Sequence, residues 1–149
     1  MQELWECPQC GAKLLNRNLS HSCGRYSVQQ FLEGKSAHAR DLFDRLVGMI
    51  ASFGPYHLAP AKTRVAFMAL VRFASVNRVS DSAIDIHFVL RRKITSARFR
   101  RVEKLGPYFV HHLRLTDTHD FDAELRQWLA MSYHEYGQRG WLKSASGGP

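Results

Sequence analysis

The chain has little cysteine and no long apolar run. Of its 149 residues only 3 are cysteine, and so small and odd a number excludes a fold held together by a disulfide framework. No apolar stretch approaches the ~20 residues that a membrane-spanning helix needs. The N-terminus, Met-Gln-Glu-Leu-Trp-Glu, is acidic and lacks an apolar h-region, so we expect no signal peptide. The sequence therefore predicts a reduced, soluble, cytoplasmic protein.

The remaining composition indicates one domain with a small appendage. A hydrophobic content of 45% is sufficient for one sizeable core. The net charge of +8 is uneven, because residues 60–114 hold 12 Lys/Arg against 3 Asp/Glu, whereas residues 115–149 hold 3 against 5. Such a local excess of positive charge attracts polyanions or anionic ligands. The alternative is a solvated basic face that has no partner.

The three cysteines and one histidine near the N-terminus have the spacing of a zinc site. They form a C-x2-C pair and an H-x-C pair: Cys7, Cys10, His21 and Cys23. Three thiolates and an imidazole are a complete tetrahedral ligand set for zinc. Gly11 and Gly24 each follow a cysteine, as in two knuckles that share one ion. We predict one structural zinc held by a knuckle over residues 1–26. A redox CxxC, or a free thiol beside an ordinary histidine, is the alternative.

Hydrophobic periodicity predicts helices at both ends of the main domain. Residues 27–35 begin with a capping-box pattern, Ser27 and Gln30, and residues 37–53 have an apolar stripe at helical spacing. Residues 118–136 have a second long stripe, and Asp117 or Asp120 is placed to cap it. We expect the tail, residues 143–149, to be disordered.

Between these helices the pattern alternates with period two. The alternating segments predict four strands: residues 64–71, 72–79, 83–90 and 108–115. Their short connections imply antiparallel pairing. The sequence thus predicts an α+β domain over residues 27–142, with an antiparallel sheet of about four to five strands and the helices covering one face.

Several segments together point to a known family. They are Cys-Pro-x-Cys-Gly, His-Ser-Cys-Gly, Lys62-Thr63-Arg64-Val65-Ala66-Phe67, Arg98-Phe99-Arg100-Arg101-Val102-Glu103 and Val110-His111-His112-Leu113-Arg114-Leu115-Thr116-Asp117. As a set they resemble the bacterial domain-of-unknown-function 5655 family, over nearly the whole chain. The resemblance implies an α+β domain, often behind a zinc-binding head, and brings no established activity.

The basic middle third supplies the candidate anion-binding residues. They are Lys62, Arg64, Arg91, Arg92, Lys93, Arg98, Arg100, Arg101 and Lys104. Lys62 and Arg64 open a predicted strand and are expected on one face, where they could hold a phosphate or carboxylate. Residues 91–104 are expected to be a surface connection between strands, with a short helix from Ser96, and can track a phosphate backbone. Phe99 either stacks on a base or, as we favour, anchors this segment in the core.

The histidines suggest a second candidate site. His111 and His112 point to opposite faces of the predicted strand, whereas His87 and His112 are expected to share the open face of the sheet with Asp85. A histidine and a carboxylate on one face suit acid–base chemistry, although polar residues on a wet face are the commoner case. The sequence has no Gly-rich phosphate loop or nucleophile elbow, and its adjacent Glu103-Lys104 does not form the E-x-K of nucleases.

Three functional hypotheses follow. The leading one is a non-enzymatic module that binds nucleic acid through its basic surface, with the zinc knuckle as a rigid arm. The second is a domain that binds a small anionic ligand on the open face, through Lys62, Arg64, Arg114 and the histidines. The third is a protein-interaction accessory domain whose partner the sequence does not name. Enzymatic activity is left open.

Overall fold

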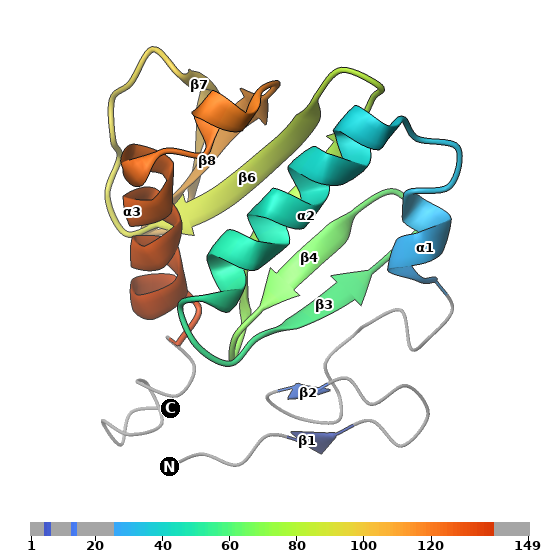
Figure 1. Cartoon of the computed structure of the whole chain (residues 1–149). Helices are drawn as coiled ribbons and strands as arrows, with labels where there is room; N and C mark the ends of the chain where they lie inside the picture. The colour runs from blue at the N-terminus through green and yellow to red at the C-terminus, as the bar shows by residue number, and fades with distance from the viewer. Residues whose placement is uncertain (1–4, 7–12, 15–25, 139–149) are drawn as a thin grey trace.

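The computed structural model describes residues 5–6, 13–14 and 26–138 (Figure 1). Its helices are α1 (Val28–Phe31), α2 (Ala37–Ala51), α3 (Ala123–Met131), a 3-10 turn (Thr118–Asp120) and a π-helical turn (Ser132–Tyr136). Its strands are β1 (Trp5–Glu6), β2 (Lys13–Leu14), β3 (His57–Pro60), β4 (Val65–Met68), β5 (Arg72–Val79), β6 (Ile84–Leu90), β7 (Phe99–Leu105) and β8 (Tyr108–Leu115). None of the described helices is both long and apolar enough to cross a membrane.

The main domain is α+β, and its six strands form one antiparallel sheet. The strand order is β3-β4-β5-β6-β8-β7, so β3 and β7 are the edges. Every pairing is antiparallel, with register shifts in the β4–β5, β5–β6 and β7–β8 pairs. Such bulges leave one residue without a partner in the register and change which side chains share a face.

The helices cover one face of this sheet, as the sequence predicts. Figure 1 shows α2 and α3 lying on the same side of the sheet, with α1 beside the N-terminal end of α2. The buried side of α2 contains Leu42, Phe43, Leu46 and Ile50 of the predicted stripe, together with Ala39, whereas Val47 and Phe53, which the stripe also included, are only partly buried. These side chains pack with Phe67 and Phe88 of the sheet in one continuous core. Burial of this apolar layer is the main favourable term in folding.

The predicted start of the first helix is confirmed. The hydroxyl of Ser27 accepts a hydrogen bond from the Gln30 N–H (3.0 Å), and the Gln30 side chain accepts one from the Ser27 N–H (2.9 Å). Ser36 caps α2 by accepting from the Ala39 N–H (3.0 Å). These short polar residues satisfy backbone donors that have no partner within the helix.

Two of the six strands were not predicted, so the expected four to five strands fall short by at least one. Residues 91–104 were expected to be a connection with a short helix, but their second half forms β7. This edge strand escaped notice because charged side chains break its alternation, and edge strands often carry such charges to prevent aggregation. Strand β3 is short and ends in Pro60, which the sequence presents as a turn signal.

The C-terminal helix is shorter than predicted and begins later. Residues 118–136 divide into a 3-10 turn, α3 and the π-helical turn. Asp117 caps the 3-10 turn, whereas α3 is capped by Asp122, whose carboxylate accepts from the Leu125 N–H (2.9 Å). Two acidic residues five positions apart thus start two separate elements. Asp120, the other candidate cap, accepts from the Thr116 N–H instead (2.8 Å).

The predicted zinc ligands and the predicted disordered tail lie outside the described residues. At the N-terminus the structure describes only the short antiparallel pair β1–β2, with Trp5 opposite Leu14 and Glu6 opposite Lys13. The segment that joins these two strands contains Cys7 and Cys10.

Candidate functional site

The face of the six-stranded sheet turned away from α2 and α3, here called the open face, carries the candidate site. Successive side chains of a strand point to opposite faces of the sheet. Ile86 and Leu113 are buried in the core under the helices, so their neighbours His87 and His112 point to the open face. The register pairs His87 with His112 on neighbouring strands, and their ring centroids lie 5.4 Å apart. The prediction that these two histidines share a face is confirmed.

A row of register partners crosses this face from β5 to β7. Its members are Ser75, His87, His112 and Arg101, called here the histidine row. The amide of Asn77 donates a hydrogen bond to His87 Nδ1 (2.7 Å), so the neutral ring carries its proton on Nε2. His112 Nε2 donates to the carboxylate of Glu103 (2.7 Å). Both rings are therefore held in place by neighbouring side chains.

The environment keeps His87 uncharged. Burial, and to a lesser extent the charges of His112, Arg72 and Arg64, lower the pKa of His87 from 6.5 to about 4, although Glu103 acts in the opposite direction. For Glu103 the charged form is favoured instead, because the hydrogen bond from His112 and the charge of Arg101 lower the pKa of its carboxyl group. At neutral pH the histidine row therefore holds a neutral imidazole beside cations.

A second row lies two residues further along the same strands. It contains Arg78, Asp85 and Arg114, called here the charged row. Arg114 forms a bidentate contact with Asp85, in which Nε donates to Oδ1 (2.7 Å) and Nη2 donates to Oδ2 (3.3 Å). This contact raises the pKa of Arg114. Arg78 is exposed and forms no ion pair with any described carboxylate. Within the part of the chain that the structure describes, one positive charge of the row is thus left without a counter-ion.

The predicted basic residues fall into two groups near the two edges of the sheet. Lys62 and Arg64 lie in the turn between β3 and β4, not within a strand as predicted, and both are exposed. The other group comprises Arg91, Arg92 and Lys93 in the loop after β6, and Arg100, Arg101 and Lys104 in β7. Of the second group, Arg101 joins the histidine row.

Arg98 has a structural position that the sequence did not reveal. Its Nη1 contacts carboxylate oxygens of Asp122 (3.0 Å) and Glu124 (3.1 Å), and its guanidinium lies 5.4 Å from the centroid of the Trp128 ring. Burial lowers the pKa of Arg98, but the hydrogen bonds to Glu124 and Asp122 outweigh it and raise the pKa overall. Arg98 ties the loop before β7 to the start of α3, which leaves it little freedom to contact a phosphate.

Phe99 anchors the same segment in the core, as the sequence favours. Its ring centroid lies 4.7 Å from that of Trp128 and 4.9 Å from that of His111. His111 is fully buried, and its Nε2 accepts a hydrogen bond from the Ile94 N–H (3.0 Å). These contacts hold the loop over residues 91–98 on the core and engage the half-buried Phe99 ring there.

Three residues of the open face were missed at the level of sequence. They are Arg72, Asn77 and Arg78, all on β5. Arg72 pairs with Met68 and is electrostatically coupled to Arg64 and His87. The register shift between Val76 and Arg78 places Asn77 beside His87 and Arg78 beside Asp85. A bulge cannot be predicted from strict alternation of polar and apolar residues. The only sequence signal for these three residues was the presence of two arginines in a strand that is otherwise mostly apolar.

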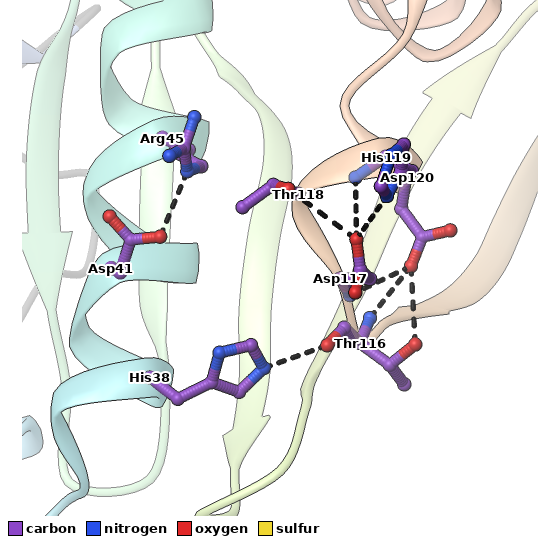
Figure 2. Close-up of polar contacts among 8 residues, drawn as sticks. All are labelled: His38, Asp41, Arg45, Thr116, Asp117, Thr118, His119 and Asp120. Carbon is purple, nitrogen blue, oxygen red and sulfur yellow. Dashed lines mark hydrogen bonds and ion pairs between the residues drawn. The ribbon is translucent and has the colours of Figure 1, made fainter.

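A further polar cluster near the end of β8 is structural rather than a site. Figure 2 shows His38 of α2 reaching the carbonyl oxygen of Thr116 (2.7 Å). Asp117 accepts from the backbone and ring of His119, and Asp120 accepts from the Thr116 N–H. These carboxylates are engaged in ordering the turn between β8 and α3, on the helix side of the molecule.

The comparisons with known proteins bear on the whole of this domain. A family model described as "Domain of unknown function (DUF5655)" matches residues 28–135, which include the complete sheet and both rows of the open face. The chain belongs to the DUF5655 family. No curated protein and no solved structure gave a significant match. The DUF5655 match begins after the predicted zinc knuckle and covers the main domain, including its open face.

Proposed function

We propose that this DUF5655 domain binds nucleic acid across the open face of its sheet. The observation that carries the proposal is an excess of cations there: Arg114 pairs with Asp85 and Arg101 with Glu103, but Arg64, Arg72 and Arg78 form no ion pair with a described carboxylate. Arg72 has no ion pair to a described carboxylate, and its pKa is lowered by burial and by the neighbouring Arg64. Two cations that destabilise each other are stabilised together by a phosphate backbone, which supplies the missing negative charge.

The charged and polar side chains of this face define a path from β4 to β7, interrupted at β5 by Ser75, which is fully buried. From β4 to β7 the path crosses four strand spacings, or about 19 Å, because neighbouring strands lie about 4.8 Å apart. Arg64 and Arg72 lie at one end of this path and Arg101 at the other, with His87 and His112 between them. Several consecutive phosphates would meet positive charge along this length.

Side chains in the middle of the path add hydrogen-bonding groups. The Nε2 proton of the neutral His87 ring and the flat ring of His112, which is tilted against it, offer contacts to a base or a sugar. Contacts to phosphates and sugars position a strand and carry no sequence information, and the cations of this face are suited to phosphates. We therefore expect affinity to depend on strand length and salt more than on sequence.

A structural zinc held by the N-terminal ligands would act beside this domain. Support comes from the ligand spacing and from the β1–β2 pair, which brings together the chain on either side of the C-x2-C segment. Cys7, Cys10, His21 and Cys23 would hold the ion, and a closed set of four protein ligands suits a structural role.

The deciding experiment is binding of the full chain to labelled single- and double-stranded DNA and RNA over a salt series. A linear fall of log affinity with log salt is expected for a phosphate-binding surface. Arg64→Gln and Arg101→Gln should each reduce the slope by about 1 and weaken binding to all sequences alike.

Arg45→Gln is the matched control, because Arg45 is an exposed arginine of α2 whose partner is Asp41 and which lies on the helix side. It should leave the slope unchanged. No binding at low salt would remove the proposal. Equal losses in Arg45→Gln and Arg64→Gln would show that net charge alone, not the open face, attracts the nucleic acid.

A further inference from the structure

A hollow at one end of the open face is a separate feature from the histidine row. Its volume is about 290 Å³, and its polar lining comprises Arg78, Ser80, Ser82, Asp85, Arg114 and Thr116. The lining comes from the end of β5, the turn that follows it, the start of β6 and the end of β8. Of these residues, only Arg114 and Asp85 were candidates from the sequence.

The charges of the hollow favour an anion. Asp85 is neutralised by the two-point contact from Arg114, through Nε (2.7 Å) and Nη2 (3.3 Å). Arg78 then contributes a positive charge that no described carboxylate balances. The fork also fixes the Arg114 guanidinium, which has five N–H donors and spends two of them on Asp85. The remaining three N–H groups and the whole of Arg78 are available for a ligand.

The number of donors indicates which anion fits. Besides the two guanidinium groups, the hollow contains the hydroxyl of Ser82, which has no hydrogen bond to a described residue, and that of Ser80, whose bond to the Ala83 carbonyl is long at 3.4 Å. A carboxylate has two oxygens, whereas a phosphate monoester has three strong acceptor oxygens and a charge near −2. The forked donors of arginine match phosphate oxygens well.

We propose that this hollow binds a phosphate monoester group. The charged row lies two residues along β6 and β8 from the histidine row, a distance of about 7 Å at ~3.4 Å per residue. A strand lying on the open face can therefore place its terminal phosphate in the hollow, and this reading rests on the proposed nucleic-acid binding. A free phosphate-bearing small molecule offers the same chemistry without it.

The test compares oligonucleotides of one sequence that carry a 5′-phosphate, a 3′-phosphate or only hydroxyl ends, together with inorganic phosphate alone. Binding to the full chain is measured by titration calorimetry or fluorescence anisotropy at fixed salt. We expect a roughly tenfold preference for one phosphorylated end, since hydrogen bonds to charged groups are among the strongest. Arg78→Gln should abolish this preference.

Arg91→Gln is the control, because Arg91 is an exposed arginine of the loop after β6 that does not line the hollow. It should keep the preference for the phosphorylated end. If oligonucleotides bind equally well with and without a terminal phosphate, the proposal that the hollow binds phosphate is wrong, whereas the proposed binding on the open face still holds. Inorganic phosphate bound in an Arg78-dependent way, without oligonucleotide binding, would support the hollow and overturn the nucleic-acid proposal. A preference that survives in Arg78→Gln would place the phosphate elsewhere.

Discussion

His87 is a residue whose charge state the fold controls. Its pKa is lowered to about 4 from 6.5, so the folded protein binds this proton less tightly than the unfolded chain does. The resulting stability is fully present above pH 6.5 and is lost as the pH falls from 6.5 toward 4. Between pH 7 and pH 5 we expect His87 to account for a loss of about 1–2 kcal/mol, from about 1.4 kcal/mol per pKa unit.

Urea unfolding at pH 7 and pH 5, in the wild type and in His87→Gln, measures this contribution. Glutamine keeps a polar side chain beside Asn77 but does not titrate, so the variant should lose less stability on acidification. His134→Gln is the control, because His134 is exposed and forms no ion pair with a described residue. An identical pH dependence in wild type and His87→Gln would contradict the buried, neutral state of His87.

Arg98 and Arg100 lie two positions apart and have different tasks. Arg98→Ala should reduce the free energy of unfolding by about 1–3 kcal/mol, because it removes ion pairs with two carboxylates and leaves Asp122 without its cation. Arg100 is exposed on β7 and has no described ion-pair partner, so Arg100→Ala should change stability by less than about 0.5 kcal/mol. Denaturant unfolding of both variants at pH 7 checks this; equal losses would place Arg98 at the surface.

At the scale of elements, the π-helical turn after α3 locks the end of the chain onto the sheet. The Ser132 hydroxyl contacts backbone carbonyls of Phe73 (2.9 Å) and Val89 (2.7 Å), and the Gly137 carbonyl accepts from the backbone N–H groups of Leu70 and Val71 (2.9 and 3.0 Å). Two central strands and the connection after β4 thereby depend on one turn. A π-helical turn in this place satisfies sheet backbone groups that have no strand partner.

Replacement of Gly137 by alanine tests how tightly the π-helical turn packs against the sheet. A Cβ built there would lie 2.6 Å from the Tyr133 carbonyl oxygen and 3.1 Å from the Ala69 Cβ, so Gly137→Ala should cost about 1–3 kcal/mol of stability. Gly48→Ala is the control, because it lies on α2 with open space around its Cβ and should stabilise the protein by about 0.5–1 kcal/mol. Thermal unfolding of both variants should show opposite shifts; a neutral Gly137→Ala would mean that the turn yields easily.

At the scale of the whole molecule, the charge is arranged by the two-layer fold. The helices bury one side of the sheet, so the arginines of β5, β7 and β8 that point the other way are gathered on the open face. Asp117 and Asp120 lie in the turn before α3, and Asp122 and Glu124 lie at its start, where they neutralise Arg98. On the open face Arg64, Arg72 and Arg78 form no ion pair with a described carboxylate, and the proposed function depends on this positive charge.

The predicted zinc is also a property of the whole chain. We expect purified protein to contain one zinc per chain and Cys23→Ser to lose it, because three ligands hold the ion far less tightly than four. Atomic emission measures the metal, and unfolding of the main domain should stay unchanged in Cys23→Ser, since the DUF5655 match begins only at residue 28. Metal-free wild-type protein would remove the zinc knuckle and would leave the open-face proposal intact.

The sequence by itself determined the class of the fold. Apolar period of 3.6 in α2 and period of two in β6 and β8 follow from backbone geometry, so these elements and the helix-covered face could be predicted. The pairing of His87 with His112 on one face followed from the same alternation. These features are local, and local spacing is what a sequence displays.

Only the tertiary structure decided which basic residues work together. The bulge in β5 brought Asn77 and Arg78 to the open face, and the strand order brought Arg64 and Arg72 near His87. Arg98 turned inward because Asp122 and Glu124, more than 20 residues away in the chain, lie beside it. Bulges, strand order and long-range ion pairs depend on contacts between distant segments, and that is why composition showed the excess of charge but not the surface that carries it.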